Sequence, residues 1–354
     1  MAKSLLSRLQ KTFLKSQHHK TRRSMQGFTL VELLVVTAIA GGIVAGLSFI
    51  VIQMMTSDQR EASRAETQRE MQMALDYMAA ELRESVYTYP GTYLENSRSN
   101  LNTTNKPFAD YLPASVSSNG AVPVLAFWKL QTFPEAVKQK CASSTATIDG
   151  VACLNGQSYA LVVYSLAPKA ANSVWKGQSR ITRYVLSQFD ASGNLTVGYV
   201  DPGENRNFAT WPWANPTSGV RNLQAARPTG QAFTLVDFVS FDASLTTEVS
   251  QTGFCPAGGA TGTTTAGSYD ISPKTAPQGV RSFYACVFSQ TATTGTSAGQ
   301  ADPTQYRDVL LFLRGSAVGR PGVQGAGRND QDVLPTVQTR VLNRSVLGRS
   351  PIGE

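Results

Sequence analysis

A single carboxylate lies near the start of a long apolar run in the sequence. Glu32 is the fifth residue of that run counted from Phe28, and no charged residue follows it from Leu33 to Met55. A charge inside an apolar segment is costly, so such a residue ordinarily has a function and a partner. The alternative is a carboxylate whose side chain reaches the lipid headgroups without a partner. Gly27, which has no side chain, lies just before Phe28 at the start of this run.

The uncharged stretch is long enough to cross a membrane as a helix. About 20 apolar residues, each rising about 1.5 Å, span a hydrocarbon core of about 30 Å. Helix-forming residues continue after Met55, and no proline occurs before Pro90. An apolar face recurs there at spacings of three and four, through Met71, Leu75, Met78, Leu82 and Val86. The sequence therefore predicts one helix with a membrane-spanning half at 28–55 and an amphipathic half at 56–88.

Most of the positive charge lies before the apolar run. The chain has a formal net charge of +8, of which residues 1–27 supply +7 with no acidic residue, which leaves +1 for the remainder. A nearly neutral remainder lacks the dense cationic array that nucleic-acid binding needs, so the sequence argues against a nucleic-acid partner. The basic segment instead predicts a cytoplasmic N-terminus and an exported C-terminal part. A secretory signal peptide is the alternative, but its cleavage site would follow the apolar run, where this sequence continues as helix.

All four cysteines lie in the part expected to be exported: Cys141, Cys153, Cys255 and Cys286. An even number in an oxidising compartment favours two disulfides, for which three pairings exist. Pairing of sequence neighbours joins Cys141 to Cys153 and Cys255 to Cys286. A zinc site is the competing interpretation, although no Cys-x-x-Cys spacing occurs and both histidines lie within residues 1–27.

After Pro90 the sequence changes to short apolar runs separated by small and polar residues, which predicts strands. The expected strands are 122–130, 159–167, 181–189, 233–243, 283–290 and 309–313, with a last one at 336–346. These strands would form an antiparallel sheet that buries one face on the helix, which makes the predicted fold class α+β. The β-rich head is expected over 89–315 and a C-terminal tail, mobile from Gly315, over 316–354. Four polar or Gly/Thr-rich segments are expected to be surface loops: 96–120, 201–231, 256–272 and 291–303.

Several residues could bind a ligand, and each has a simpler structural explanation. The four tryptophans belong either to the core or to a sugar-stacking surface, for which the candidate is the stretch from Trp211 to Trp213. Oxygen ligands for calcium cluster at 201–205 and 329–332, but neither segment has the EF-hand spacing. No metal or cofactor is therefore expected.

The sequence shows no catalytic arrangement. A Ser/His/Asp or Cys/His site needs a histidine base, and His18 and His19 lie in the basic segment. Glu81 and Glu84 are expected on a solvated face of the helix. We therefore expect a protein that is not an enzyme.

The six residues from Gly27 to Glu32, Gly-Phe-Thr-Leu-Val-Glu, resemble the cleavage and methylation motif of the type IV prepilin family at every position. The resemblance implies that a prepilin peptidase removes residues 1–27 by cutting after Gly27 on the cytoplasmic side. Phe28 would become the N-methylated N-terminus. Glu32 would pair with the Phe28 ammonium of a neighbouring subunit, which offsets two desolvation costs and fixes the axial register.

A looser resemblance covers much of the rest of the chain. The segments 74–87, 127–129 and 334–342 look like the larger J/W-type minor pilins, and in particular like cyanobacterial pseudopilins of hormogonium polysaccharide secretion. This implies a structural and assembly subunit of a type IV pilus or of a type II secretion-like filament, serving motility or the secretion of polysaccharide or protein. The alternatives are a filament-displayed binding protein for glycan, surface or DNA, and a plain single-pass anchored protein.

The same resemblance implies the partners and the location. Other major and minor pilins would contact the N-terminal helix, an inner-membrane assembly platform would add the subunit to the filament, and lipid would surround the helix before assembly. A glycan partner stays open. The chain would begin as a single-pass inner-membrane protein with an exported head and end in an extracellular or periplasmic filament.

Overall fold

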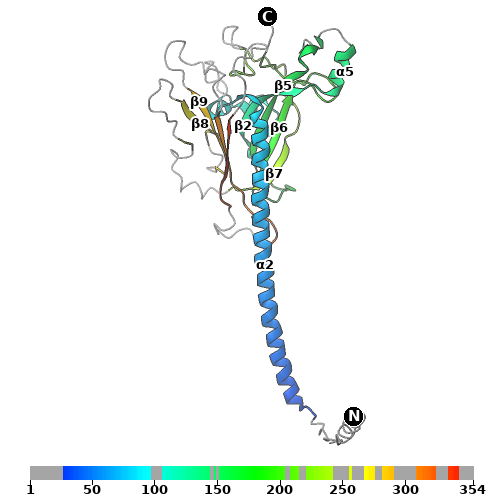
Figure 1. Cartoon of the computed structure of the whole chain (residues 1–354), viewed down its shortest axis with the longest axis vertical. Helices are drawn as coiled ribbons and strands as arrows, with labels where there is room; N and C mark the ends of the chain where they lie inside the picture. Colours follow the sequence, from blue (N-terminus) through cyan, green and yellow to red (C-terminus); the bar gives the residue numbers. More distant parts are fainter. Residues whose placement is uncertain are drawn as a thin grey trace, which may run out of the picture. The chain divides into compact units, whose positions relative to one another are not determined.

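The computed structural model of the chain describes residues 27–96, 106–143, 147–148, 151–203, 208–214, 221–241, 255–256, 267–275, 281–290, 308–323 and 334–342 (Figure 1). The chain divides between Met55 and Thr56 into two units. Helix α2 (Leu30–Arg83) runs through this boundary. Its first half belongs to the first unit, and its second half is the first element of the second unit. The fold is α+β, as predicted.

The second half of α2 buries one face in the second unit. Met71, Leu75, Met78 and Leu82 are completely buried, which confirms four of the five residues in the predicted apolar stripe. The fifth residue, Val86, does not belong to the helix. The helix ends at Arg83 rather than at residue 88, because the next residues form strand β1 (Ser85–Thr88). Their valine, tyrosine and threonine favour a pleated strand that pairs with a neighbour.

The strands form two large antiparallel sheets, whereas the sequence predicted one. The first has the order β1-β2-β5-β6-β7, with β2 (Val122–Thr132), β5 (Gln157–Pro168), β6 (Ser179–Ser187) and β7 (Phe233–Val239). The second has the order β11-β10-β9-β8, with β8 (Gly267–Ser272), β9 (Phe283–Gln290), β10 (Asp308–Leu313) and β11 (Val337–Leu342). A small hairpin joins β3 (Thr147–Ile148) to β4 (Val151–Ala152).

Short helical segments connect the strands. They are α3 (Gly91–Glu95), η2 (Phe108–Tyr111), α4 (Ala114–Ser117), η3 (Ser118–Gly120), α5 (Glu135–Ser143) and η4 (Cys153–Asn155). Three of them, η2, α4 and η3, lie in the segment 96–120, which was predicted to be a surface loop. That prediction is wrong for its second half, because Phe108, Leu112 and Val116 are completely buried.

One hydrophobic core joins the two sheets to the second half of α2. It contains Leu75 and Leu82 of the helix, Phe127 of β2 and Phe283 of β9. Figure 1 shows β8 and β9 to one side of this part of α2 and β6 and β7 to the other. The second half of α2 is therefore held by both sheets rather than by one.

Two further loop predictions need correction. The segment 256–272 contains β8, which pairs with β9 from Gly267 to Ser272. The segment from Gly315, predicted to be a mobile tail, packs on α2 as far as Val323. There the Ser63 hydroxyl donates to the Pro321 carbonyl at 2.7 Å.

Arg320 strengthens this contact with α2. Its guanidinium is 2.7 Å from a Glu66 carboxylate oxygen, and it also pairs with Glu70. The same side chain lies over the ring of Phe238 at 4.2 Å from the ring centroid. Because the Arg320 side chain is only 8% exposed, these partners are what make its burial tolerable.

Both disulfides join sequence neighbours. Cys141 pairs with Cys153, with their Cα atoms 5.5 Å apart, and Cys255 pairs with Cys286, with their Cα atoms 5.7 Å apart. The first bond ties α5 to η4, and the second ties residue 255 to β9. All four cysteines are used, which leaves no thiolate for the competing zinc site.

Candidate processing and assembly site

The motif residues lie at the N-terminus of α2. Gly27 and Phe28 precede the helix, and Thr29 caps it. The Thr29 hydroxyl oxygen accepts a hydrogen bond from the Glu32 backbone N–H at 3.3 Å, and the Thr29 carbonyl accepts one from Leu33 N–H at 3.1 Å. Thr29 and Glu32 have the spacing of a capping box, in which the glutamate is the third helical residue. The sequence signal of this cap is Thr-x-x-Glu, from Thr29 to Glu32.

The capping position gives Glu32 a favourable electrostatic environment. A carboxylate in the first turn of a helix interacts well with the unpaired backbone N–H groups and with the positive end of the helix dipole. This is a structural role that Glu32 has without any partner. A test of its role in assembly must therefore keep the cap while removing the charge.

The site is accessible. Phe28 is 76% exposed, and a Cβ atom built on Gly27 would meet nothing within 4 Å. Substitution of Gly27 would consequently disturb no described contact within the chain. The structure places Gly27, Phe28 and Glu32 within one short segment, while residues 1–26 lie outside the described part of the chain.

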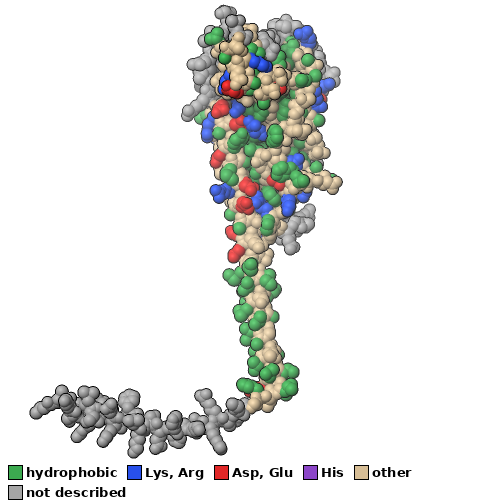
Figure 2. Space-filling model, turned by 90° about the vertical axis from the view of Figure 1, so that its right-hand side faces the viewer, with side chains coloured by type: hydrophobic (Ala, Val, Ile, Leu, Met, Phe, Trp, Pro, Cys, Tyr) green, Lys and Arg blue, Asp and Glu red, His purple; other side chains and the backbone are tan. Residues whose placement is uncertain are grey.

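In the apolar half of α2, no described residue of the chain covers the helix surface. All residues from Gly27 to Met55 are exposed, and the helix continues through Gly41, Gly42 and Gly46 without interruption. Figure 2 shows the hydrophobic side chains along this stretch. This helix is long and apolar enough to cross a membrane. An apolar surface on all sides of a helix needs lipid or other helices around it. The first unit therefore has the properties of a membrane anchor.

Glu81 holds the second half of α2 on the first sheet. It was expected on a solvated face, and that expectation is wrong: its side chain is 9% exposed, whereas that of Glu84 is 65% exposed. The Arg183 guanidinium donates to both Glu81 carboxylate oxygens, at 2.9 and 2.6 Å, and the Lys129 ammonium lies 2.9 Å away. The Tyr164 hydroxyl also donates to Glu81. Strands β2, β5 and β6 thus each supply one partner.

This environment changes the acidity of Glu81. Burial alone would raise the pKa of the carboxyl group, but hydrogen bonds from Arg183, Tyr164 and Lys129 and the charge of Arg183 lower that pKa from 4.5 to about 2. The carboxylate therefore stays charged far below neutral pH. Sequence reasoning could have found Glu81 because it continues the stripe of Ala74 and Met78 at spacings of four and three.

We expect Glu81→Gln to destabilise the second unit at neutral pH by about 3 kcal/mol, the value of a pKa shift of this size at about 1.4 kcal/mol per pKa unit. Because the folded-state pKa is depressed, the contribution is full above about pH 4.5 and is lost as the pH falls towards 2. Urea unfolding of the full-length chain in detergent, followed by tryptophan fluorescence, measures it, since all four tryptophans lie after Thr56.

Glu84→Gln is the matched control for this measurement. Glu84 lies three residues further along the chain, just after the end of α2, and its side chain contacts only Lys129, at 3.3 Å, among the contacts described for it. Its loss should therefore cost less than about 1 kcal/mol. Equal effects of the two substitutions, or a Glu81 effect that persists at pH 2, would contradict this account of the cluster.

The proposed glycan contact at Trp211 to Trp213 is wrong. Trp211 is completely buried and Trp213 is 6% exposed. The Trp211 indole N–H donates to the Val200 carbonyl at 3.0 Å, and its ring packs edge-on against Trp128 at 5.6 Å. These rings belong to the core. Trp175, which is 40% exposed, is the one tryptophan that presents a ring to solvent.

No metal centre emerges from the described residues. Within them, no group of three or more His, Cys, Asp or Glu side chains is placed to hold a metal ion. Of the two calcium candidates, Asp201 accepts a hydrogen bond from Gly203 N–H at 2.8 Å, as in a local turn. Residues 204–205 and 329–332 lie outside the described part of the chain.

Comparison with known proteins identifies the N-terminal segment. Residues 22–48 match the family model described as the prokaryotic N-terminal methylation motif. No curated protein and no solved structure shows significant similarity to the chain. The motif implies processing by a prepilin peptidase and assembly with other pilins. The long helix followed by antiparallel sheets agrees with the α+β pilin fold. Together, the matched motif and the exposed apolar helix that it begins support a type IV prepilin-like protein, of the pilin or pseudopilin kind.

Proposed function

We propose that the chain is a minor pilin or pseudopilin, a structural and assembly subunit of a type IV pilus or a type II secretion-like filament. The observation that carries this proposal is the methylation motif at the accessible start of a helix whose apolar half is exposed throughout. A prepilin peptidase would cut after Gly27, and Phe28 would then be N-methylated. Catalysis by the chain itself forms no part of this function.

Glu32 would set the register of the subunit in the filament. Cleavage creates an ammonium group at Phe28, and Glu32 is the only carboxylate between Phe28 and Met55. When the helix leaves lipid and packs among other apolar helices, both charges lose water. Pairing Glu32 with the Phe28 ammonium of a neighbouring subunit offsets these desolvation costs.

The proposed location follows from the charge and the disulfides. The basic residues before the apolar run favour a cytoplasmic N-terminus in the inner membrane. The two disulfides lie in the second unit, which agrees with export to an oxidising compartment. An inner-membrane assembly platform would then move the subunit from lipid into a periplasmic or extracellular filament.

The second unit supports the minor, J/W-type assignment. It contains two sheets and two disulfides around one helix and is large, so a place at or near the filament tip suits it. The filament would serve motility or the secretion of polysaccharide or protein. A filament-displayed binding protein is the second candidate, favoured by the exposed ring of Trp175.

Fractionation of the producing cell tests the proposal. An antibody against the second unit should detect the chain in filaments sheared from the cell surface, or in purified periplasmic filaments, in addition to the membrane. In a strain without prepilin peptidase the chain should remain only in the membrane. A chain that stays in the membrane fraction of wild-type cells under filament-forming conditions would instead be a plain single-pass anchored protein.

A further inference from the structure

A cavity of about 340 Å³ lies on the first sheet, on the face away from α2. Its floor contains Arg180 and Thr182 of β6 and Thr234 of β7, and Thr182 is paired directly with Thr234. The neighbouring residue Arg183 contacts Glu81 of α2. Because successive side chains of a strand point to opposite faces, Arg180 and Thr182 lie on the other face.

Polar residues and two aromatic residues border this floor. Ser118 and Gln231 are among the polar residues that line the cavity, and Trp175 and Phe233 also line it. Trp175 is 40% exposed and Phe233 is 74% exposed. An exposed aromatic ring beside polar groups can pack on the apolar face of a ligand that also forms hydrogen bonds.

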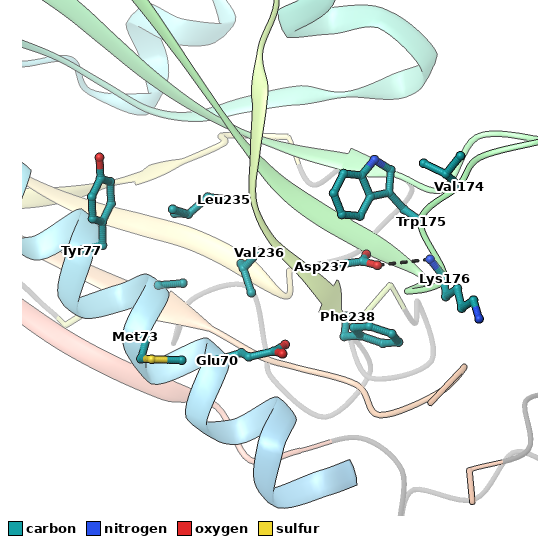
Figure 3. A pocket seen from close by; sticks show the side chains of 11 residues that line it. Glu70, Met73, Tyr77, Val174, Trp175, Lys176, Leu235, Val236, Asp237 and Phe238 are labelled. Carbon is teal, nitrogen blue, oxygen red and sulfur yellow. Dashed lines mark hydrogen bonds between the residues drawn. The ribbon is translucent and has the colours of Figure 1, made fainter. Parts of the chain in front are cut away.

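Trp175 also lines a second, larger cleft of about 700 Å³ between α2 and β7. Figure 3 shows Trp175, which lies in the loop before β6, on the opposite side of β7 from Tyr77 of α2. In the same view, Asp237 accepts a hydrogen bond from the Lys176 backbone N–H. Lys176 lines this larger cleft but not the cavity beside Arg180. The two cations nearest to Trp175 in sequence therefore belong to different surfaces.

Arg180 is the cation of the cavity. Its side chain forms no hydrogen bond or ion pair with any described residue, whereas Arg183, three residues further along β6, pairs with Glu81 of α2. A guanidinium group binds a carboxylate with two parallel hydrogen bonds. The exposed ring of Trp175 offers a flat apolar face, and the hydroxyl and amide groups offer hydrogen bonds to a ligand rich in hydroxyls. The volume lies at the lower end of small-ligand sites, which measure about 300–1,000 Å³.

We propose that this cavity binds a uronate residue of an acidic polysaccharide. Arg180 pairs with the sugar carboxylate, Trp175 covers one face of the ring, and Thr234, Ser118 and Gln231 bind ring hydroxyls. A peptide carboxylate would use Arg180 but leave the aromatic and hydroxyl-bearing walls unused, so the lining favours a sugar. This binding activity goes beyond the filament role, and its test does not depend on assembly.

Isothermal titration of the full-length chain in detergent micelles tests the site. The probes are a uronate trisaccharide, a neutral glucose trisaccharide and sodium acetate. We expect saturable binding of the uronate and at least about tenfold weaker binding of the neutral sugar and of acetate. Arg180→Gln should weaken uronate binding about tenfold or more, and Trp175→Ala should weaken binding of both sugars.

Lys176→Gln is the matched control, since it removes a cation beside Trp175 that does not line the cavity. It should leave uronate affinity unchanged, and each variant should keep the wild-type urea midpoint. The proposal is overturned if no uronate binding saturates, if Arg180→Gln binds like the wild type, or if Lys176→Gln loses as much affinity as Arg180→Gln. Acetate that binds as tightly as the uronate would show a simple carboxylate site and exclude a sugar ligand.

Discussion

The Gly27→Glu variant is expected to keep its first 27 residues and to accumulate in the membrane as the uncut chain. A peptidase cleft that accepts a bare backbone at Gly27 has no room for a longer, charged side chain. The substitution should leave the fold of the chain unchanged, because a Cβ at this position meets nothing within 4 Å. Intact-mass analysis of membrane protein should show that the variant is heavier than the processed wild type by the mass of residues 1–27.

Gly27→Ala is the control for this experiment, since it adds only a methyl group at the same accessible position. We expect the alanine variant to be cut, at a reduced rate, and the glutamate variant not to be cut. If Gly27→Glu is processed to the same mass as the wild type, the peptidase does not recognise this glycine, and the assignment of the motif is wrong.

Glu32→Gln is expected to be cut and inserted normally but lost from filaments. Glutamine can replace glutamate in a capping box, so the cap with Thr29 is retained while the charge is removed. The Phe28 ammonium of the neighbour is then buried without its partner, and breaking such a pair costs about 3–5 kcal/mol. Since about 1.4 kcal/mol is tenfold in an equilibrium, incorporation should fall by about a hundredfold or more. Immunoblots of sheared filaments against membrane fractions measure this ratio.

Glu61→Gln provides the matched control, because Glu61 is an exposed glutamate on the same helix beyond the apolar run. It should enter filaments as the wild type does. A carboxylate that only reaches the headgroups predicts the opposite result for Glu32→Gln: easier insertion and unchanged incorporation. A subunit at the tip has no neighbour above it, so the number of filaments per cell should be counted as well.

The sequence was most informative where the controlling interactions are local. The processing motif is six consecutive residues, and the spacing of Met71, Leu75, Met78 and Leu82 records the buried face of the helix directly. Strand β9 has the predicted bounds because its apolar residues are contiguous between polar segments. In each case the residues that decide the structure are neighbours in the chain.

Other features depend on residues that are distant in the sequence. Helical spacing places Glu81 on the buried face of α2, but its partners Lys129 and Arg183 come from β2 and β6, and nothing near Glu81 in the sequence predicts them. The segment with β8 has only one strongly apolar aliphatic residue, Ile271, and becomes a strand through its pairing with β9. The Arg180 cavity likewise collects residues from separate strands and loops, which no local pattern reveals.

The mature N-terminus of the wild-type chain is the most direct test of the central claim. The chain should be isolated from filaments or, failing that, from the membrane, and its N-terminal peptide should be sequenced by mass spectrometry. We expect a peptide that begins at Phe28 and carries one additional methyl group on its amino nitrogen. A mature N-terminus at any other residue, or an intact chain that retains residues 1–27 in cells with an active prepilin peptidase, would contradict the account.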